Sequence, residues 1–419
     1  TFQLLSPPIL RRNVFSLSQT LAPLQPLKHA QVAPVLRLRM LGLHRMAIIY
    51  SLTATINALF RQTDVSQGDC DELAQSLVGG PVEPVPIQGE FSYTVIAGPD
   101  SSKVVQFRAQ KSTLELETLK LARTVHLRFV TACDYHGTIG SSSPLSVYVM
   151  DKIPGIAYIQ FRGANHVATD MSINTVMDLA SFFAESWIHR QPKSSSMLKA
   201  IHCDFAQRLD VLSRSLPARF ADALKQASSG LALLFTPSYP LVLAHGDLCE
   251  MNILVDPNSG HISGIIDWAE AKILPFGTSL WGLENTLGFM DSTGWHYYDN
   301  HRDLEALFWR TFYGIVGEIS ETDKHAIHVA RTMGLFLRYG FVWEDGVRER
   351  PARENDSRLR YLDAFLAPST LSEEEMVEAR FVPTSRNTRR LTSNQVAFGQ
   401  KLLQRINIWQ RFAVDEDSV

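Results

Sequence analysis

Three polar residues, Asp247, Asn252 and Asp267, have the types and the spacing of a site for a divalent cation. Asp247 ends the tripeptide His-Gly-Asp, Asn252 lies five residues later, and Asp267 lies a further fifteen residues along the chain. Carboxylate and amide oxygens are ligands that Mg²⁺ prefers, and a bound Mg²⁺ commonly shares its remaining positions with phosphate oxygens. The sequence therefore predicts a place where magnesium and a phosphate compound meet.

The His-Gly-Asp tripeptide alone would not support this prediction, because an Asp after Gly in a loop is most often a turn former or a helix cap. The prediction depends on the combination with Asn252 and Asp267, each of which stands next to a short apolar run. His245 is better interpreted as a hydrogen-bonding residue that braces the loop than as a chemical base.

Three apolar runs are expected to position these residues, at 241–244, 253–255 and 262–266. The turn-forming sequence Pro-Asn-Ser-Gly at 257–260 separates the last two runs, so we expect strands joined in a hairpin. Asp247 and Asn252 then lie on the loop that enters the hairpin, and Asp267 lies where the hairpin ends. The hairpin would thereby bring the parts of the predicted site together.

The order of these residues is similar to that in protein kinases, where an Asp accepts the substrate proton and an Asn and a later Asp hold metal. More closely, the chain resembles the aminoglycoside phosphotransferase (APH)-like family of small-molecule kinases, and among these the fungal members without assigned substrates. The resemblance rests on HGDLCEMNILVD from residue 245, IIDWAEA from residue 265 and VYVMDKIPG at 147–155. It covers about residues 66–350.

The resemblance implies a two-lobed α+β fold like that of protein kinases, with a small antiparallel-sheet lobe and a larger, mainly helical lobe. It implies transfer of the γ-phosphate of ATP to a hydroxyl of a small molecule, with ATP and Mg²⁺ as cofactors. Asp247 would be the catalytic base, and Asn252 and Asp267 would hold Mg²⁺. Cys-Glu-Met at 249–251 departs from the His-Pro-Gly often found in this loop, but the loop keeps its length.

A short helix at 69–77 and then a strand, a turn and a second strand over 84–98 are expected before the predicted site. In kinase-like folds such a hairpin covers the phosphates, and glycine lets the backbone approach the anion closely. Gly89, Phe91 and Ser92 at the tip are therefore candidate nucleotide-binding residues. Any β-hairpin would show the same pattern, so its position upstream of the His-Gly-Asp tripeptide is what favours this interpretation.

The third strand, at 103–108, lacks the inward-pointing lysine that kinases use to hold the phosphates. Gln106 and Arg108 share one face of this strand by the period of two, whereas Lys103 points to the other face. Arg108 can bind a phosphate bidentately in place of an ammonium group, but Gln106 supplies no charge. We therefore predict that Arg108, with Gln106 beside it, lies at the nucleotide.

The next helix, expected at 114–125, offers Glu117 as the ion-pair partner of the strand-three cation, with Glu115 as the competitor. Either glutamate can equally be a solvated charge on the helix surface, which is the more common fate. A further strand at 146–150 leads into a linker that corresponds to the kinase hinge. Its candidate nucleotide-binding residues are Met150, Asp151 and Ile153. Because a hinge binds adenine through backbone groups, these side chains do not distinguish ATP from GTP.

Three amphipathic helices are expected after the hinge, because apolar residues recur at helical spacing over 175–189, 303–316 and 324–341. Their aromatic residues are predicted to be core. The sequence gives its least specific signals for the residues that would bind the acceptor. Glu270, Trp281 and Glu284 follow Asp267 and could recognise a cationic or polyhydroxyl acceptor through charge pairing and cation–π contact. They could equally be surface charges and a core tryptophan.

The charge distribution sets apart a basic extension at 1–63. The resemblance implies a nucleotide-binding lobe at 64–153 and a catalytic, acceptor-binding lobe at 154–370, followed by a tail at 371–419. The extension has seven basic and no acidic residues, as in a mitochondrial transit peptide or a disordered segment. The protein is otherwise expected in the cytoplasm, and as a monomer.

The remaining composition limits the possible partners. The net charge of −3 gives no support for nucleic-acid binding, and no apolar run reaches the length of a membrane span. The four cysteines form no CxxC pair and are expected to be reduced; Cys249 could be reactive but is better interpreted as a buried spectator. Two other functions stay open. The unusual third strand would suit a catalytically silent nucleotide-binding protein or scaffold. A protein kinase is disfavoured by the missing Asp-Phe-Gly and Ala-Pro-Glu.

Overall fold

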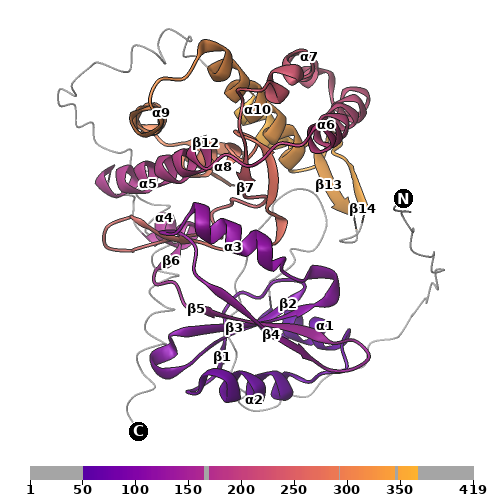
Figure 1. Ribbon diagram of the computed structural model, residues 1–419, viewed down its shortest axis with the longest axis vertical. Coiled ribbons are helices and arrows are strands. Elements are labelled where there is room, and N and C mark those ends of the chain that lie inside the picture. The colour runs from indigo at the N-terminus through magenta and orange to yellow at the C-terminus, as the bar shows by residue number, and fades with distance from the viewer. Residues whose placement is uncertain (1–50, 165–168, 292, 345–347, 367–419) are drawn as a thin grey trace, which may run out of the picture.

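The computed structural model describes residues 51–164, 169–291, 293–344 and 348–366, which form two lobes (Figure 1). The smaller lobe is built on an antiparallel sheet, and the larger lobe is mainly helical. This arrangement confirms the predicted two-lobed α+β fold. The described part of the chain contains no helix that is both long and apolar enough to cross a bilayer. The predictions for residues 1–50 and for the tail at 371–419 lie outside the described residues.

The smaller lobe contains a five-stranded antiparallel sheet in the order β1-β2-β3-β5-β4, together with three helices. In chain order its elements are α1 (Leu52–Phe60), α2 (Gln67–Val78), β1 (Glu83–Pro84), β2 (Ser92–Ala97), β3 (Lys103–Ala109), α3 (Leu116–Val125), β4 (Cys133–Ile139) and β5 (Leu145–Asp151). Ser66 begins α2 with a capping box to Asp69, which explains why this helix starts before residue 69.

Helix α1 lies in the segment that the sequence assigned to a basic extension. Ser51 caps its first turn, and Ile56 and Leu59 are buried in the apolar core of the smaller lobe. The lobe therefore begins at least twelve residues before the expected boundary at residue 64, since it includes Leu52. The amphipathic pattern of this helix was obscured by the polar residues Thr53, Thr55 and Asn57 on its outer side.

The two faces of the sheet have different roles. Alternate residues of β2, β3 and β5 point into the apolar core against α1 and α2, among them Tyr93, Val105 and Phe107. The opposite face carries polar residues that are aligned across the three strands by the register, as the rows Ser92–Arg108–Ser146 and Thr94–Gln106–Tyr148. Gln106 and Arg108 therefore do share a face, as the sequence predicts, and that face lies toward the larger lobe (Figure 1).

The hairpin expected over 84–98 is only partly formed. Its first strand, β1, is two residues long, because Pro84 and Pro86 have no backbone N–H to donate. The side chain of Gln88 replaces the missing strand pairing by bonding both backbone groups of Thr94, at 2.7 Å to its N–H and 2.8 Å to its carbonyl. The loop over 85–91 is therefore held by a buried side chain instead of by a strand ladder.

The larger lobe contains the remaining elements, of which the long helices form an aromatic core. They are β6 (Ile156–Ala157), α4 (Tyr158–Ala164), α5 (Thr169–Ile188), α6 (Ser195–Ser215), α7 (Ala221–Gly230), β7 (Leu241–Ala244), β8 (Ile253–Val255), β9 (Ile262–Ile265), β10 (Lys272–Pro275), α8 (Trp281–Leu287), β11 (Gly288–Met290), β12 (Trp295–Tyr297), α9 (His301–Val316), α10 (Glu321–Tyr339), β13 (Phe341–Glu344), β14 (Arg348–Pro351) and α11 (Leu359–Phe365).

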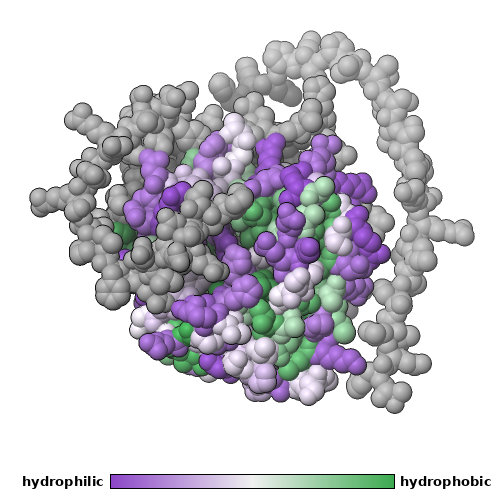
Figure 2. Space-filling view, turned by 90° about the horizontal axis from the view of Figure 1, so that it is seen from above, coloured by the Kyte–Doolittle hydropathy of each residue, from purple (hydrophilic) through white to green (hydrophobic). Residues whose placement is uncertain are grey.

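The three helices expected in this lobe are confirmed as α5, α9 and α10. Their aromatic residues are core, as predicted: Trp187 meets Phe276 edge-on at 4.9 Å, and Phe276 stacks on Phe312 at 5.4 Å. Figure 2 views the molecule from this lobe and shows hydrophilic residues interspersed with smaller hydrophobic patches. Ile188 and Ile315 are exposed hydrophobic residues of this lobe.

The hairpin that carries the predicted site is formed by β8 and β9, joined through the turn at 257–260. The run at 241–244 does not join it. That run is β7, which instead pairs antiparallel with β10, whereas β6 completes the hairpin sheet beside β8. Two segments connect these neighbouring sheets: the loop between β7 and β8 and the segment between β9 and β10. The two segments lie close together and hold the polar residues of the site.

Candidate active site

The loop at 245–252, here called the HGD loop, joins β7 to β8. Two backbone bonds fold it tightly, from Cys249 N–H to the Asp247 carbonyl at 2.9 Å and from Asn252 N–H to the Cys249 carbonyl at 3.0 Å. The Asn252 amide nitrogen donates to the Asp247 carbonyl at 2.8 Å and to its Oδ2 at 3.1 Å. Because the Asn252 nitrogen faces Asp247, its side-chain oxygen is directed to the other side, where it can accept a cation.

His245 holds the HGD loop from within the core. Its Nε2 donates to the Ile266 carbonyl at 2.9 Å, and its Nδ1 accepts from the Asp247 N–H at 3.1 Å. These two bonds require the neutral tautomer with the proton on Nε2. Burial lowers the pKa of His245 to about 4, so the ring is neutral at physiological pH. His245 therefore makes the contacts of a brace, the interpretation that its sequence context favours.

Gly246 is the position where the HGD loop passes closest to the chain after β9. A Cβ at this position would overlap with the backbone carbonyl of Glu270. Glycine is therefore required by a close approach of two backbones. The contact fixes the distance between the HGD loop and the segment that follows Asp267.

Asp267 lies at the end of β9, next to the HGD loop. The preceding residue, Ile266, donates its N–H to the Asn252 carbonyl at 2.9 Å, which brings Asn252 and Asp267 together. Asp267 has left-handed backbone angles (φ 62°, ψ 63°), a conformation that is uncommon for residues other than glycine. Such strain at a polar residue is typical of functional sites.

The electrostatics of Asp267 favour a bound cation. Burial raises the pKa of Asp267, Arg108 lowers it, and the negative charge of Asp247 raises it again. The amide oxygen of Asn252 and the carboxylate of Asp267 are hard oxygen donors that fit Mg²⁺. In the described residues no group of three or more His, Cys, Asp or Glu side chains is arranged to hold a metal ion. A magnesium ion at Asn252 and Asp267 would therefore depend on phosphate oxygens and water to complete its shell.

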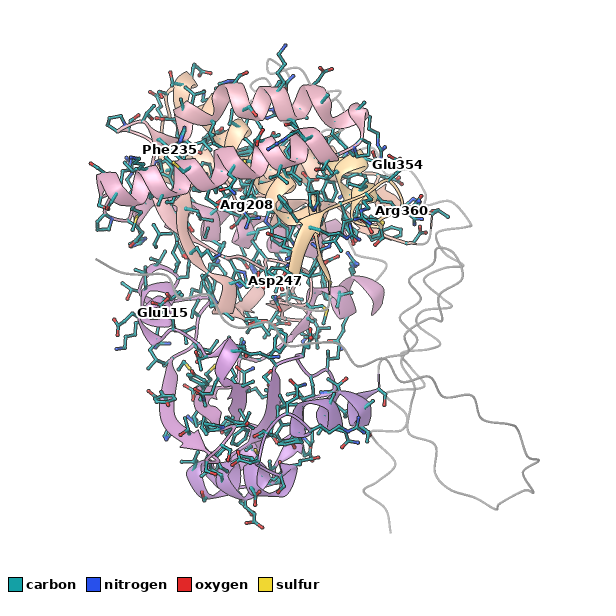
Figure 3. The ribbon with its side chains drawn as sticks, turned by 90° about the vertical axis from the view of Figure 1, so that its right-hand side faces the viewer. Glu115, Arg208, Phe235, Asp247, Glu354 and Arg360 are labelled. Atoms are coloured by element: carbon teal, nitrogen blue, oxygen red, sulfur yellow. The ribbon has the colours of Figure 1, made fainter. Side chains whose placement is uncertain are left out.

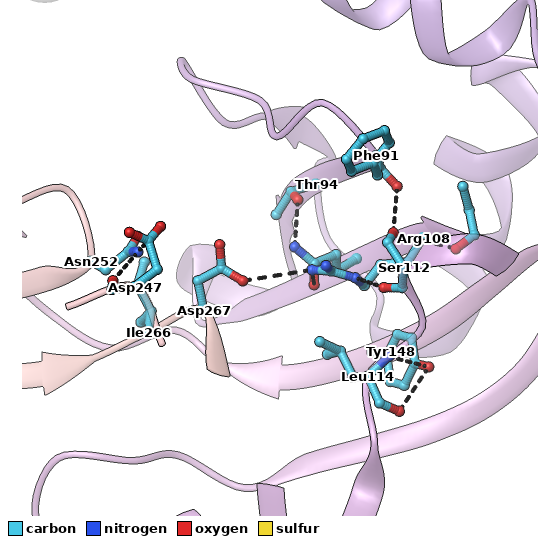
Figure 4. Close-up of polar contacts among 12 residues, drawn as sticks. Phe91, Thr94, Arg108, Ser112, Leu114, Tyr148, Asp247, Asn252, Ile266 and Asp267 are labelled. Carbon is cyan, nitrogen blue, oxygen red and sulfur yellow. Dashed lines mark hydrogen bonds and ion pairs between the residues drawn. The ribbon is translucent and has the colours of Figure 1, made fainter. Parts of the chain in front are cut away.

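Arg108 reaches Asp267 from the smaller lobe, across the boundary between the lobes (Figure 4). Its Nη1 lies 4.0 Å from Oδ1 of Asp267 and donates to Oε1 of Gln106 at 3.1 Å, while its Nε donates to the Ser112 carbonyl at 2.6 Å. Gln106 in turn donates to Thr94 Oγ1 at 3.1 Å. The neutral Gln106 thus orients the buried guanidinium without neutralising it.

Glu117 is not brought to Arg108, so the expected ion pair is not formed. Helix α3 begins at Leu116, and its first turn directs Glu117 into solvent, where it pairs with Lys120 at 2.8 Å. Glu115, the competing candidate, accepts a hydrogen bond from Thr118 at 2.7 Å. Both glutamates are therefore solvated charges on the helix surface, which was the alternative interpretation of the sequence.

The other candidate nucleotide-binding residues lie around the polar face of the sheet. Gly89 is exposed in the loop held by Gln88, Ser92 is buried on β2, and the Phe91 carbonyl accepts from the Ala109 N–H at 3.0 Å. Lys111 lies over the Phe91 ring at 4.3 Å.

The hinge follows β5 directly. Met150 is part of β5, Asp151 ends it and forms an ion pair with Lys103, and Ile153 packs against Gly264 of β9. Lys103 is therefore used in an ion pair at the edge of the lobe, away from Arg108. The hinge residues connect β5 with the hairpin that carries Asp267, but their role in nucleotide binding stays a prediction.

The acceptor-side candidates are separated by the structure. Glu284 is 1% exposed; it forms an ion pair with Arg331 and accepts from the Tyr297 hydroxyl at 3.1 Å. It is therefore a structural residue and not an acid that faces an acceptor, because both of its oxygens are used inside the lobe. Trp281 is also buried, at 3% exposed. Glu270 remains near the site, where burial and then the negative charge of Asp247 raise its pKa.

Sequence reasoning missed one residue of the site. Arg338, near the end of α10, forms an ion pair with Oδ1 of Asp247, and its guanidinium lies 4.7 Å from the Trp281 ring. Figure 3 shows Asp247 where the two lobes meet. The only sequence signal was a cation at the end of an amphipathic helix, which is normally explained by the helix dipole.

Comparison with known proteins supports a phosphotransferase. Residues 103–307 match the family model described as the phosphotransferase enzyme family, APH. No curated protein matches the chain. Among solved structures, the GDP and kanamycin complex of APH(2″)-IIia is 16% identical, with 78% of this chain and 99% of that chain covered and a TM-score of 0.42.

Two further solved structures are similar at the same level. Macrolide 2′-phosphotransferase MphH from Brachybacterium faecium is 15% identical, with 76% of this chain and 99% of that chain covered and a TM-score of 0.41. APH(3″)-Id from Streptomyces rimosus, in complex with ADP and streptomycin, is 14% identical, with 60% and 92% covered and a TM-score of 0.38. The family match spans β3, the HGD loop and Asp267, so this part of the chain is similar to the phosphotransferase enzyme family.

Proposed function

We propose that the protein is an ATP- and Mg²⁺-dependent phosphotransferase that moves the γ-phosphate of ATP to a hydroxyl of a small molecule. The observation that carries this proposal is the convergence of Asp247, Asn252 and Asp267 from one lobe with Arg108 from the other. Two oxygen donors and a guanidinium face the same place from opposite sides. That place suits a magnesium-bound triphosphate.

The residues of the chain have separate roles in this proposal. Arg108 binds a phosphate oxygen with its planar fork, held in position by Gln106 and the Ser112 carbonyl. Asn252 and Asp267 would hold magnesium, which would offset the negative charge of the phosphate oxygens. Catalysis of this kind is mainly positioning and electrostatic stabilisation, because the transition state of phosphoryl transfer is loose.

Asp247 is the proposed base. The acceptor oxygen attacks the γ-phosphorus, the bond from this phosphorus to the β–γ bridging oxygen breaks, and ADP leaves with the electron pair. The proton of the acceptor hydroxyl passes to Asp247, whose Oδ2 is held by Asn252 and whose Oδ1 is held by Arg338. Both contacts orient the carboxylate without using all of its lone pairs.

Thermal unfolding with ATP plus Mg²⁺, compared with ATP plus a chelator, tests the proposed nucleotide site. A ligand at about 100 times its dissociation constant stabilises a fold by roughly 2.7 kcal/mol, which gives a measurable rise in Tm. We expect a magnesium-dependent rise for the wild type and its loss in Asp267→Asn. Asp222→Asn, an exposed Asp-to-Asn change on α7, is the matched control and should behave as the wild type.

The opposite results are equally informative. A rise that is independent of Mg²⁺ or that survives in Asp267→Asn would contradict the metal assignment. A magnesium-dependent rise without any phosphoryl transfer would favour the silent nucleotide-binding protein, an alternative motivated by the absence of the strand-three lysine.

A further inference from the structure

The acidic residues near Asp247 do not suit a cationic acceptor, because most of them are already paired inside the lobe. Asp247 pairs with Arg338, Glu284 pairs with Arg331, and Glu250 pairs with Arg162 at 2.8 Å. Glu270 is the exception, since it has no ion pair among the described residues.

The surroundings of Glu270 do not make it a strong site for an ammonium group. Its pKa is raised by burial and then by the negative charge of Asp247, so its own charge is disfavoured. A cationic acceptor would therefore meet one carboxylate, close to the magnesium side of the site. The charge pairing once expected from Glu284 is absent, because that residue is buried against Arg331.

On the other side of Asp247 lie two arginines that are linked to each other. Arg358, at the start of α11, donates from Nη1 to the Arg338 carbonyl at 2.7 Å. Arg338 in turn is fixed between the Asp247 carboxylate and the face of Trp281. The HGD loop, α8, α10 and α11 thus meet at a point where Arg338 pairs with the proposed base and Arg358 lies close enough to interact with it electrostatically.

Arg358 has no ion-pair partner among the described residues. Its one hydrogen bond goes to a neutral carbonyl, and no described carboxylate lies within ion-pair distance. Burial lowers the pKa of Arg358 and the like charge of Arg338 lowers it further, while the charge of Asp247, which is already paired with Arg338, raises it by a smaller amount. The nearby phenols of Tyr339 and Tyr361 do not compensate it, because burial raises the pKa of both and keeps them neutral. A part-buried guanidinium without a counter-charge is costly and gains by binding an anion.

We propose that the acceptor carries an oxyanion, a carboxylate or a phosphate, near its reacting hydroxyl, and that Arg358 binds this group beside Asp247. The inference rests on the proposed function and narrows its acceptor to hydroxylated oxyanions. The planar fork of arginine matches the two oxygens of such a group. Arg338 remains on Asp247 as a positioning residue, and its charge adds to the attraction for the anion.

Inorganic phosphate is the probe for the test, and Mg²⁺-ADP is present in excess so that the nucleotide site is filled. Phosphate affinity is measured by calorimetry and by the rise in Tm. We expect saturable binding to the wild type, a loss of at least tenfold in affinity for Arg358→Gln and a smaller loss for Arg358→Lys, which keeps the charge. Arg310→Gln, an exposed arginine of α9, is the matched control and should bind as the wild type.

Three outcomes would overturn the inference: no phosphate binding by the wild type, equal binding by Arg358→Gln, or binding of kanamycin, used as a polycationic probe, that is lost in Glu270→Gln. Circular dichroism and retained Mg²⁺-ADP binding show whether each variant is folded. If Arg358→Gln does not fold, the phosphate affinity of Arg358→Lys provides the test. The proposed function is tested separately in the same samples. Failure of Mg²⁺-ADP binding counts against the nucleotide site, whereas its success together with unchanged phosphate binding in Arg358→Gln counts against the oxyanion site alone.

Discussion

Acidification should destabilise the protein through His245, because this residue is neutral only in the folded state. His245 is 1% exposed, and burial lowers its pKa from 6.5 to about 4. In the unfolded state the His245 side chain therefore binds a proton more tightly than it does in the folded state. The unfolded state takes up the proton between about pH 6.5 and pH 4, so the contribution of His245 to stability is complete above this window and is lost as the pH falls through it.

The magnitude follows from the two pKa values. Because the pKa of this histidine falls from 6.5 to about 4 on folding, the free energy of unfolding should decrease by about 2–3 kcal/mol between pH 7.5 and pH 4.5. In the folded protein the ring itself is protonated only near and below about pH 4, where protonation of Nδ1 removes the acceptor for the Asp247 N–H and should loosen the HGD loop. The loss of this hydrogen bond would affect the position of Asp247 first.

The assay is urea unfolding at pH 7.5 and pH 4.5, followed by tryptophan fluorescence, for the wild type and His245→Asn. The asparagine removes the titration but keeps polar atoms. We expect the variant to be less stable than the wild type at pH 7.5, by about 1–3 kcal/mol for the lost bonds, and the difference to narrow markedly at pH 4.5. His126 is also buried with a lowered pKa, but it is present in both proteins and cancels.

A matched control separates His245 from histidines in general. His325 is exposed on α10, so His325→Asn should show the pH dependence of the wild type. The reasoning would be refuted if His245→Asn lost as much stability between the two pH values as the wild type does. That result would mean that His245 is not held neutral by its surroundings.

Three other predictions concern the same region. Gly246→Ala should destabilise the protein by about 1–3 kcal/mol through overlap with the backbone after β9, whereas Gly314→Ala, where a Cβ meets nothing within 4 Å, should stabilise α9 by about 0.5–1 kcal/mol; similar unfolding curves for both variants would contradict the close approach. Arg108→Gln should weaken Mg²⁺-ATP binding at least tenfold in calorimetry, with Arg108→Lys intermediate, and unchanged affinity would remove Arg108 from the nucleotide site. Burial raises the pKa of Cys249 to about 11, so a thiol reagent at pH 7.5 should label the exposed Cys203 long before Cys249, and the reverse order would contradict its spectator role.

Local patterns made much of the fold predictable. In the helices α5, α9 and α10 apolar residues recur at helical spacing, so their period is visible in the sequence. The hairpin of β8 and β9 was equally visible, because its turn residues lie between two apolar runs. The partner of β7 could not be predicted in this way. Its partner β10 follows the hairpin in the chain, and no local signal specifies a pairing between non-consecutive strands.

Long-range partners explain what was missed in the site. Asp247 and Arg338 are 91 positions apart, and a cation at a helix end does not indicate which carboxylate it meets. Glu284 looked like an acceptor-site acid because its partner Arg331 comes from a different helix. Glu117 looked like a partner of Arg108 because the start of α3, which decides the direction of its first turn, cannot be placed within a residue or two from sequence.

ADP formation from ATP and Mg²⁺, measured for the wild type and Asp247→Asn with hydroxylated acceptors and with water alone, tests the central proposal most directly. Nucleotide binding is measured in the same samples. We expect the wild type to form ADP faster with a suitable acceptor, and Asp247→Asn to bind Mg²⁺-ATP but lose at least a hundredfold in rate, as the removal of a general base typically does. Turnover in Asp247→Asn equal to that of the wild type, or a wild type that binds Mg²⁺-ATP and never forms ADP, would contradict the account.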